Sequence, residues 1–132
     1  MTPSRPLACV ALLAAVAGCA TPPMPREITD AADGARVRLA VAQELIVTLD
    51  GNQTTGFRWV LTRAAAPIVV QVGDAVYSAR GGDSRLVGGG GVTTFRFKAD
   101  KAGESQLVFN YRRPWEANIP PARTVRFDVL VE

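Results

Sequence analysis

The sequence contains no histidine, and its two cysteines, Cys9 and Cys19, both lie within the first twenty residues. Histidine is the commonest general base in enzymes and the commonest metal ligand, so its absence removes the usual means of acid–base catalysis and metal binding. A nucleophilic hydrolase would need such a base beside its nucleophile. Carboxylate pairs remain available, but no spacing of Asp and Glu indicates them. We therefore expect no enzymatic activity, no metal and no cofactor.

Clustered positive charge is also missing from the sequence. The formal net charge at pH 7 is +3, from 15 Lys and Arg against 12 Asp and Glu, and no run of five or six basic residues occurs. Nucleic-acid binding usually requires basic side chains gathered into a patch or stripe. The charge is instead a small excess of arginine spread along the chain, and we expect no nucleic-acid partner.

The one long hydrophobic run, Leu7–Ala17, is too short to span a bilayer, which takes roughly 20 apolar residues. With Arg5 before it and small residues after it, the run is typical of a secretory signal. The sequence Val16-Ala17-Gly18-Cys19 resembles the bacterial lipobox, in which cleavage precedes a cysteine that is then lipidated. This resemblance predicts a lipoprotein signal peptide at residues 1–18 and lipidation of Cys19. The alternative is ordinary secretory cleavage that leaves Cys19 unmodified.

Lipidation of Cys19 would determine where the mature chain resides. Cys9 would leave with the signal, so the mature domain would have no free thiol and no disulfide in an oxidising compartment. The lipid would hold the protein at the bacterial cell envelope. Ala20, rather than Asp, at the second mature position favours the outer membrane by analogy with bacterial sorting rules. We expect a monomer attached to the membrane through this lipid.

Residues 19–35 are expected to form a flexible tether between the lipid and the folded domain. The segment is rich in proline, alanine and acidic residues, a composition typical of a mobile linker. A regular apolar pattern begins at Arg36, so the domain is predicted to extend over residues 36–132.

Apolar residues alternate with polar or small residues along most of this domain. A period of two indicates strands with one buried face, and no stretch has a convincing helical period longer than two turns. About seven or eight short strands separated by turn-rich segments are typical of a two-sheet β-sandwich or a small barrel. No cysteine pair brackets a tryptophan, so a sandwich would be an immunoglobulin-like variant without the disulfide. The clearest strands are Glu44–Asp50, Phe57–Thr62, Thr93–Lys98, Ser105–Tyr111 and 125–131.

Three connections between these strands have an unusual composition. Each alone has a plain interpretation, because Asn, Thr and Gly form turns, a glycine run is flexible, and Pro-Trp can cover the end of a sandwich. Together they combine a polar loop, a bare glycine backbone, a cation and a rigid aromatic side chain. The candidate residues are Asn52, Gln53, Thr54, Thr55, Gly56 and Phe57 in the first loop, Gly88, Gly90 and Gly91 in the glycine loop, and Arg113, Pro114 and Trp115 in the third loop.

These loops are predicted to share one end of the sandwich, because alternate connections of an immunoglobulin-type sandwich emerge at the same end. Tryptophan and arginine are the side chains most often found at binding hot spots, and glycines let a partner's backbone come close. The surface is therefore predicted to bind a partner and to hold no catalytic constellation. Phe57 and Trp59 are expected to face the core and to hold the first loop in place.

The three motifs, their order and their spacing resemble those of the chagasin family of protein inhibitors of cysteine proteases. The family's motifs are N-P-T-T-G-[YF], G-x-G-G and R-P-[WF], on neighbouring loops of an immunoglobulin-like β-sandwich. Here they are NQTTGF at 52–57, GGGG at 88–91 and RPW at 113–115. The resemblance covers about residues 37–131. It implies an all-β, immunoglobulin-like sandwich of seven to eight strands without a disulfide.

The resemblance also implies a function, which is reversible, competitive inhibition of papain-like, cathepsin L-type cysteine proteases. Thr54 and Thr55 would lie nearest the catalytic pair at the centre of the active-site cleft. Trp115 would stack on aromatic enzyme residues on the primed side. Gly90 and Gly91 would lie on the non-primed side and permit main-chain hydrogen bonds, in the manner of an added strand.

Gln53 departs from the family pattern, which has proline at this position. Proline fixes φ and lowers the entropy lost when a loop is ordered. We therefore expect a more mobile first loop and weaker binding than a proline would give. Two other functions remain open. Trp115 could be a platform for carbohydrate in an envelope lipoprotein, or the chain could bind another envelope protein in a purely structural role.

Overall fold

The computed structural model describes residues 2–4, 23–80 and 90–132. Cys19 and Gly88, which the sequence predicts to be lipidated and to contact a partner, lie outside these residues. No helix in the described ranges has the length and apolar character needed to cross a membrane. The described elements are β1 (Arg26–Thr29), η1 (Asp30–Ala32), β2 (Arg36–Leu39), β3 (Glu44–Gly51), η2 (Gln53–Thr55), β4 (Arg58–Arg63), β5 (Val69–Gln71), β6 (Val76–Ala79), β7 (Gly91–Ala99), β8 (Gly103–Arg112) and β9 (Arg123–Val131).

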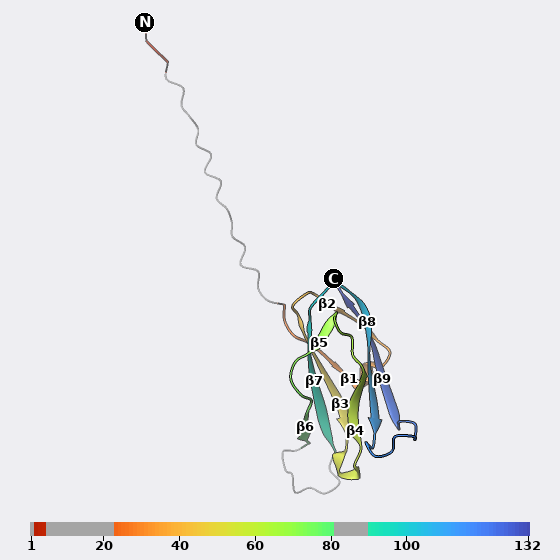
Figure 1. Ribbon diagram of the computed structural model, residues 1–132. Helices are drawn as coiled ribbons and strands as arrows, with labels where there is room; N and C mark the ends of the chain where they lie inside the picture. Colours follow the sequence, from red (N-terminus) through yellow and green to blue (C-terminus); the bar gives the residue numbers. More distant parts are fainter. Residues whose placement is uncertain (1, 5–22, 81–89) are drawn as a thin grey trace.

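The strands form two sheets packed face to face (Figure 1). The first sheet has the order β1-β3-β7-β5, with β6 also paired to β7, and the second has the order β2-β9-β8-β4. The pairs β1–β3 and β2–β9 are parallel, and the remaining pairs are antiparallel. The predicted all-β, immunoglobulin-like sandwich is therefore confirmed, with almost no helix among the described residues.

The core lies between the sheets and contains the inward-facing residues that alternation predicts. Burial alternates along β7 and β9, as it must when one face of each strand is covered and the other is not. Phe109 of β8 is fully buried and packs against Phe95, with ring centroids 4.8 Å apart, and against Phe127, at 6.2 Å. The buried apolar residues that carry most of this packing are Leu45, Val47, Leu49, Phe95, Phe97, Leu107, Phe109, Val125, Phe127 and Val129.

The boundary predicted for the tether needs correction, because the folded domain begins before Arg36. Residues Arg26–Thr29 form β1, which pairs in parallel with β3. The side chain of Ile28 is 8% exposed and joins the core, and Asp30 accepts a hydrogen bond from Arg123 at 2.9 Å. A four-residue strand with a single buried apolar residue shows no alternation of apolar and polar residues, so it could not be predicted from the sequence pattern. β1 also explains why nine strands are described where seven to eight were predicted.

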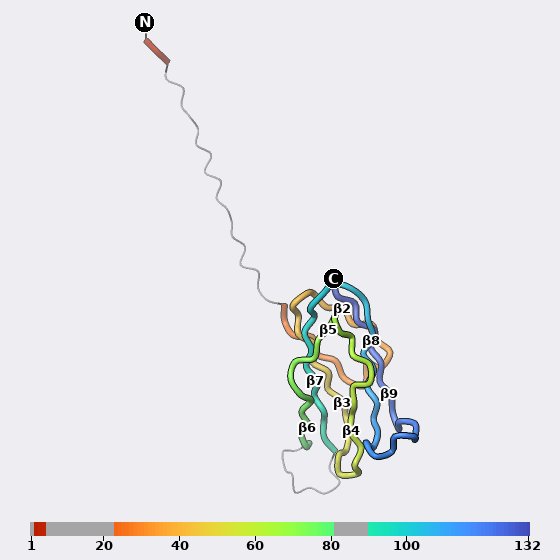
Figure 2. Tube along the Cα trace, viewed as in Figure 1, coloured from red at the N-terminus to blue at the C-terminus, as the bar shows by residue number. Residues whose placement is uncertain are grey.

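The sandwich has two distinct ends, which are separated by the length of β3. At one end Gln43 donates a hydrogen bond to the backbone oxygen of Met24 at 2.7 Å, and we call this the tether end. At the other end β3 stops at Gly51, and we call this the loop end. Eight extended residues span roughly 24 Å. Figure 2 shows the C-terminus at the tether end and the turns of residues 51–57 and 112–122 at the loop end.

Candidate functional site

The first loop is a single turn of 3₁₀ helix that carries its own caps. Asn52 precedes the helix, and its side-chain oxygen accepts hydrogen bonds from the backbone N–H of Thr54 at 3.0 Å and from the Thr54 hydroxyl. The Thr55 hydroxyl donates to the Asn52 carbonyl at 2.9 Å. Gly56 ends the turn with φ +83°, a conformation that favours glycine. Both threonines remain exposed at the tip of the loop.

Gln53 occupies the first helical position of this turn. A backbone N–H at that position has no acceptor within the helix, which is why proline is tolerated there. A proline would therefore fit this position, and Gln53 forms the turn without it. The loop of this chain relies on the hydrogen bonds of Asn52 and Thr55 where a proline would restrict the backbone directly.

Tyr111 of β8 holds the base of the first loop, a role that the sequence did not reveal. Its hydroxyl accepts a hydrogen bond from the backbone N–H of Asn52 at 2.8 Å and donates one to the Asn52 carbonyl at 3.2 Å. Its ring lies between Phe57 and Trp59, with centroid distances of 5.1 and 4.9 Å. Trp59 is buried, and its Nε1 donates to the carbonyl of Asp50 at 2.9 Å. The start of the first loop is therefore held by two aromatic residues of the second sheet, Trp59 at Asp50 and Tyr111 at Asn52.

Arg113 joins the third loop to the first. Its Nε donates to the carbonyl of Thr55 at 3.0 Å, and its guanidinium lies 4.5 Å from the centroid of the Phe57 ring. Its Nη1 also forms an ion pair with Glu116 at 3.1 Å. The sequence suggested only a cation for a partner to meet, whereas the structure shows a side chain that already positions two loops. Phe57 accordingly lies half-buried beneath Arg113 and against Tyr111, rather than within the core.

Trp115 lies across Gly56 and remains largely exposed. Its side chain is 69% exposed, although the indole contacts the backbone of the first loop. A Cβ added at Gly56 would overlap the ring and would lie 3.1 Å from Cζ2. Glycine is thus required at this position both by φ and by the close approach of Trp115. A large apolar side chain held in place but uncovered is the usual form of a binding anchor.

Gly90 and Gly91, which the sequence predicted to contact a partner together, have different surroundings in the structure. Gly91 begins β7, where it pairs with Gly51 on one side and Ala79 on the other, and a Cβ there would lie 2.5 Å from the oxygens of Ser78 and Tyr77. The sequence predicted that Gly91 would pair with a partner's backbone. Both edges of its backbone already pair with strands of this chain, so it has no free edge for a partner strand. Among the described residues, a Cβ at Gly90 would meet the Gly51 carbonyl alone, at 3.7 Å.

Two hollows flank the first loop within the described part of the chain. One, of about 300 Å³, separates it from the glycine loop, and the other, of about 120 Å³, lies beside the third loop. The first is lined by Asp50, Gly51, Asn52, Arg80, Gly90, Gly91, Tyr111 and Arg123. The second is lined by Phe57, Arg112, Arg113, Glu116, Ile119, Pro120 and Ala122. The first loop is thus a ridge between two grooves, with Trp115 beside it.

Among the described residues, parts of the three loops lie close together at the loop end. The first and third loops touch through Arg113, Thr55 and Trp115, and Gly90 lies beside Gly51. Gly88 lies outside the described residues. No group of three or more His, Cys, Asp or Glu that could hold a metal occurs in the described ranges. The surface is shaped for contact, with a ridge of small polar residues and one large aromatic side chain.

Comparison with known proteins identifies the family to which this domain belongs. The family model described as "Chagasin family peptidase inhibitor I42" matches residues 38–129. Chagasin of Trypanosoma cruzi is 27% identical over 113 residues, which cover 83% of this chain and 98% of that protein.

Solved structures of similar proteins share the fold. The cysteine protease inhibitor EhICP2 of Entamoeba histolytica aligns with a TM-score of 0.73 and 21% identity, over 83% of this chain and 96% of its own. PbICP-C, solved in complex with falcipain-2, aligns with a TM-score of 0.50 and 21% identity, over 82% of this chain and 89% of its own. The match of the family model over most of the domain shows that the chain belongs to the chagasin family of peptidase inhibitors.

Proposed function

We propose that this protein is a reversible, competitive inhibitor of papain-like, cathepsin L-type cysteine proteases, and that its three loops block the active-site cleft. The observation that carries the proposal is the ridge formed by the first loop, with Trp115 seated on Gly56 and Arg113 bonded to Thr55. Membership of the family, and the complex of the related PbICP-C with falcipain-2, support it. The family consists of peptidase inhibitors, and the chain is not an enzyme.

The shape of the first loop explains how it could fill a protease cleft without being cut. Substrates of such proteases lie in the cleft as extended strands, whereas Gln53–Thr55 is a 3₁₀ turn held by Asn52. The turn would bring the exposed threonines to the centre of the cleft without presenting an extended peptide bond to the catalytic cysteine. Inhibition would then need no covalent step and would reverse on dissociation.

The other two loops would contact the cleft on either side of this centre. Trp115 would stack on aromatic residues on the primed side, where its exposed indole loses little side-chain entropy on binding. The glycine loop would lie on the non-primed side. Of its described residues, Gly90 would approach the partner's backbone, since no described atom lies within 3.7 Å of a Cβ there, while Gly91 supports the fold.

We further propose that the protein is a monomeric lipoprotein of the bacterial cell envelope, attached to the outer membrane through Cys19. Residues 1–18 would be the signal peptide, and residues 19–25 would form the tether. Met24 lies at the tether end, opposite the loops. A lipid on Cys19 would therefore leave the loop end facing away from the membrane and open to a protease. Mass spectrometry of the membrane fraction would detect the acylated N-terminal cysteine, and an unmodified N-terminus at another residue would contradict it.

The function is tested with a chain that begins at Ala20, which retains every described element of the fold. It is titrated against papain and a cathepsin L-type enzyme while the initial rate of a fluorogenic substrate is followed. We expect saturable inhibition that substrate overcomes and dilution reverses. Thr54→Ala combined with Trp115→Ala should weaken it at least about thirtyfold, in keeping with about 2 kcal/mol or more at a hot spot. Val41→Ala, an exposed change at the tether end, is the control.

No inhibition at tens of micromolar by a folded sample would contradict the proposal. The exposed Trp115 would then favour the alternative, an envelope lipoprotein that binds carbohydrate. Its mark would be polysaccharide binding that is lost with Trp115→Ala but survives changes at Thr54 and Gly90. Binding to another envelope protein would be found by crosslinking in intact cells.

A further inference from the structure

The outer face of the sheet β2-β9-β8-β4 gathers arginines that are far apart in the sequence. Arg58 of β4 lies directly opposite Arg112 of β8. Further along the face, Arg63 and Arg126 lie on either side of Val108. Arg58, Arg63 and Arg126 are exposed, and Arg112 is half-buried. We call these four residues the arginine patch.

No member of the arginine patch forms an ion pair among the described residues, although Arg63 shares a hollow with Glu104 and Asp128. Between its two rows the face carries Val60 and the hydrogen-bonded pair Asn110 and Thr124, none of which is charged. Asp33, at the edge of the sheet, accepts a hydrogen bond from the backbone N–H of Arg126 and not from its guanidinium.

This arrangement costs stability. Like charges directly opposite each other on neighbouring strands repel, as Arg58 and Arg112 must. The Nε of Arg112 is also buried without a hydrogen-bond partner. Neither feature helps the fold, although Arg112 also donates to the third loop, and the exposed positive charge suggests an interaction with a partner.

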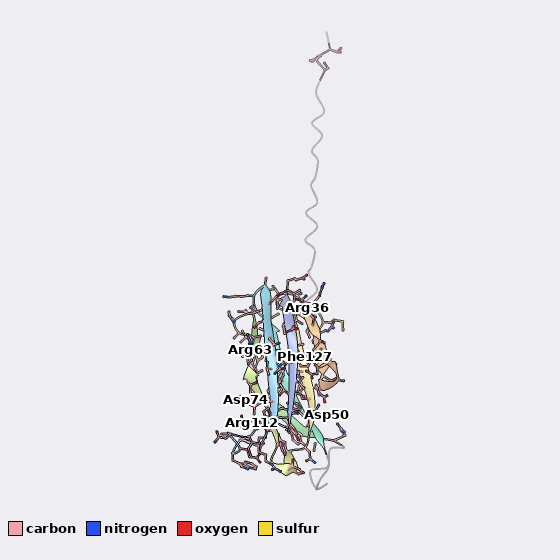
Figure 3. All side chains as sticks on the ribbon, turned by 90° about the vertical axis from the view of Figure 1, so that its right-hand side faces the viewer. Arg36, Asp50, Arg63, Asp74, Arg112 and Phe127 are labelled. Carbon is pink, nitrogen blue, oxygen red and sulfur yellow. The ribbon has the colours of Figure 1, made fainter. Side chains whose placement is uncertain are left out.

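The charge on this face is polarised toward the loop end. At the tether end of the same face, Arg36 is paired with Glu104 at 3.0 Å, and Asp128 lies opposite Arg36. Figure 3 looks onto this face and shows Arg36 near the tether end, Arg63 in the middle and Arg112 close to the loops. Arg58 and Arg112 therefore adjoin the proposed binding surface, whereas Arg63 and Arg126 lie nearer the middle of the sheet.

The arginine patch is also continuous with the third loop. Arg112 directly precedes Arg113, and its Nη2 donates to the carbonyl of Glu116 at 2.8 Å. Together with Phe57 and Ile119, Arg112 lines the hollow of about 120 Å³ beside the third loop. A protein that covers the third loop would bring its surface next to Arg58 and Arg112.

We propose that the arginine patch steers the inhibitor onto cysteine proteases whose cleft rim is acidic. The inference rests on the proposed function and names the class of target. Rim charges act mainly on the association rate, which complementary fields raise by about 10- to 1,000-fold at low salt. The Debye length is about 10 Å at 0.1 M salt, so at that salt only Arg58 and Arg112, which lie next to the third loop, would attract a bound or nearly bound protease. In more dilute salt screening is weaker, and all four arginines would contribute. An anionic membrane is the weaker candidate, because the patch lies away from Met24 and the tether end.

The test compares association rate constants for the chain that begins at Ala20 with those of Arg58→Glu/Arg126→Glu. The matched control is Arg38→Glu/Lys101→Glu, which makes the same change in net charge at the tether end. Rates are measured by stopped flow at about 20 and 300 mM NaCl, against one cathepsin L-type protease with an acidic cleft rim and one with a basic rim. Adsorption to vesicles of about 30% anionic lipid is measured in parallel.

With the acidic protease at low salt, we expect the patch variant to associate at least tenfold more slowly, the control to stay within twofold of the unmodified chain, and the difference to shrink at high salt. Dissociation rates should change little. Equal association rates for the patch variant and the unmodified chain would overturn the proposal but leave the inhibitor function standing. Vesicle adsorption that depends on Arg58 and Arg126, with unchanged protease association, would also overturn it and assign the patch to membranes. Failure to inhibit either protease at any salt would instead overturn the proposed function.

Discussion

The indole of Trp115 rests on the α-carbon of Gly56, so the third loop is packed directly onto the backbone of the first. This contact orients an aromatic side chain that is otherwise 69% exposed. A side chain that stood free in solution would lose more conformational freedom on binding than one already placed. The relationship between these two residues therefore links a glycine of one motif to the tryptophan of another.

Gly56→Ala should weaken inhibition more than it weakens the fold. The alanine Cβ would displace Trp115, and φ +83° would cost about 1–2 kcal/mol in a residue with a side chain. Gly34→Ala is the matched control, because Gly34 has φ +80° and nothing within 4 Å of an added Cβ. The melting temperature should fall by a similar amount in both variants. The inhibition constant should rise about tenfold or more only for Gly56→Ala. Equal inhibition constants would show that the position of Trp115 does not matter.

Arg113→Lys should impair inhibition although it preserves the charge. Lysine cannot both donate to the Thr55 carbonyl and lie flat on the Phe57 ring, as the guanidinium does. Hydrogen bonds to charged groups contribute about 1.5–3 kcal/mol, so we expect a loss of roughly ten- to a hundredfold in affinity. Arg96→Lys, in the distant ion pair with Glu44, is the control. Unchanged affinity for Arg113→Lys would mean that the partner meets only a positive charge here.

Tyr111→Phe should loosen the first loop without disturbing the core. The substitution keeps the ring between Phe57 and Trp59 but removes the hydroxyl that bonds both backbone groups of Asn52. An unsatisfied group of this kind costs about 1–3 kcal/mol. Amide hydrogen exchange at Asn52 should accelerate, and inhibition should weaken. Thr62→Val removes a hydroxyl that donates to the Val108 carbonyl, away from the first loop, and should change neither quantity. Normal protection of the Asn52 amide in Tyr111→Phe would contradict the anchoring role.

Gln53→Pro should tighten inhibition. Gln53 holds the first position of the 3₁₀ turn, where proline fits and no helical hydrogen bond is lost. A compatible proline typically stabilises by about 0.4–1 kcal/mol through the unfolded or free state, which corresponds to roughly two- to fivefold in affinity. Gln53→Ala separates this effect from the loss of the amide side chain. Weaker binding by the proline variant would mean that the amide of Gln53 itself contacts the protease.

Alternation in the sequence predicted β3, β4, β7 and β8, because each carries several apolar residues on one face. β1 was missed for the opposite reason. Ile28 is its only buried residue, and the strand depends on parallel pairing with β3, a contact between distant segments that no local pattern reveals. The extent of the ordered domain was therefore predicted ten residues too short at its N-terminal end, at 36 rather than 26.

The candidate loops could be predicted from composition and order, but the contacts that hold them could not. Tyr111 looked like an ordinary strand residue, and only the register of β8 against β4 places it opposite Trp59 and below Asn52. The arginine patch was hidden in the same way, because its members are dispersed in sequence and meet only when three strands align. In both cases the missing information was the pairing of strands.

Gly90→Ala and Gly91→Ala should separate binding from folding within one motif. At Gly91 the new Cβ would lie 2.5 Å from the oxygens of Ser78 and Tyr77, and overpacking of this kind costs about 1–3 kcal/mol. The melting temperature of Gly91→Ala should therefore fall by several degrees, since about 1 kcal/mol corresponds to roughly 4–8 °C in a domain of this size. At Gly90 the nearest atom among the described residues is 3.7 Å away. Stability should therefore be unchanged while the inhibition constant rises, because the methyl group would stand between the loop and a partner's backbone. Scanning calorimetry and inhibition assays on the two variants measure both quantities, and a stable Gly91→Ala variant would show that β6 can shift away from β7.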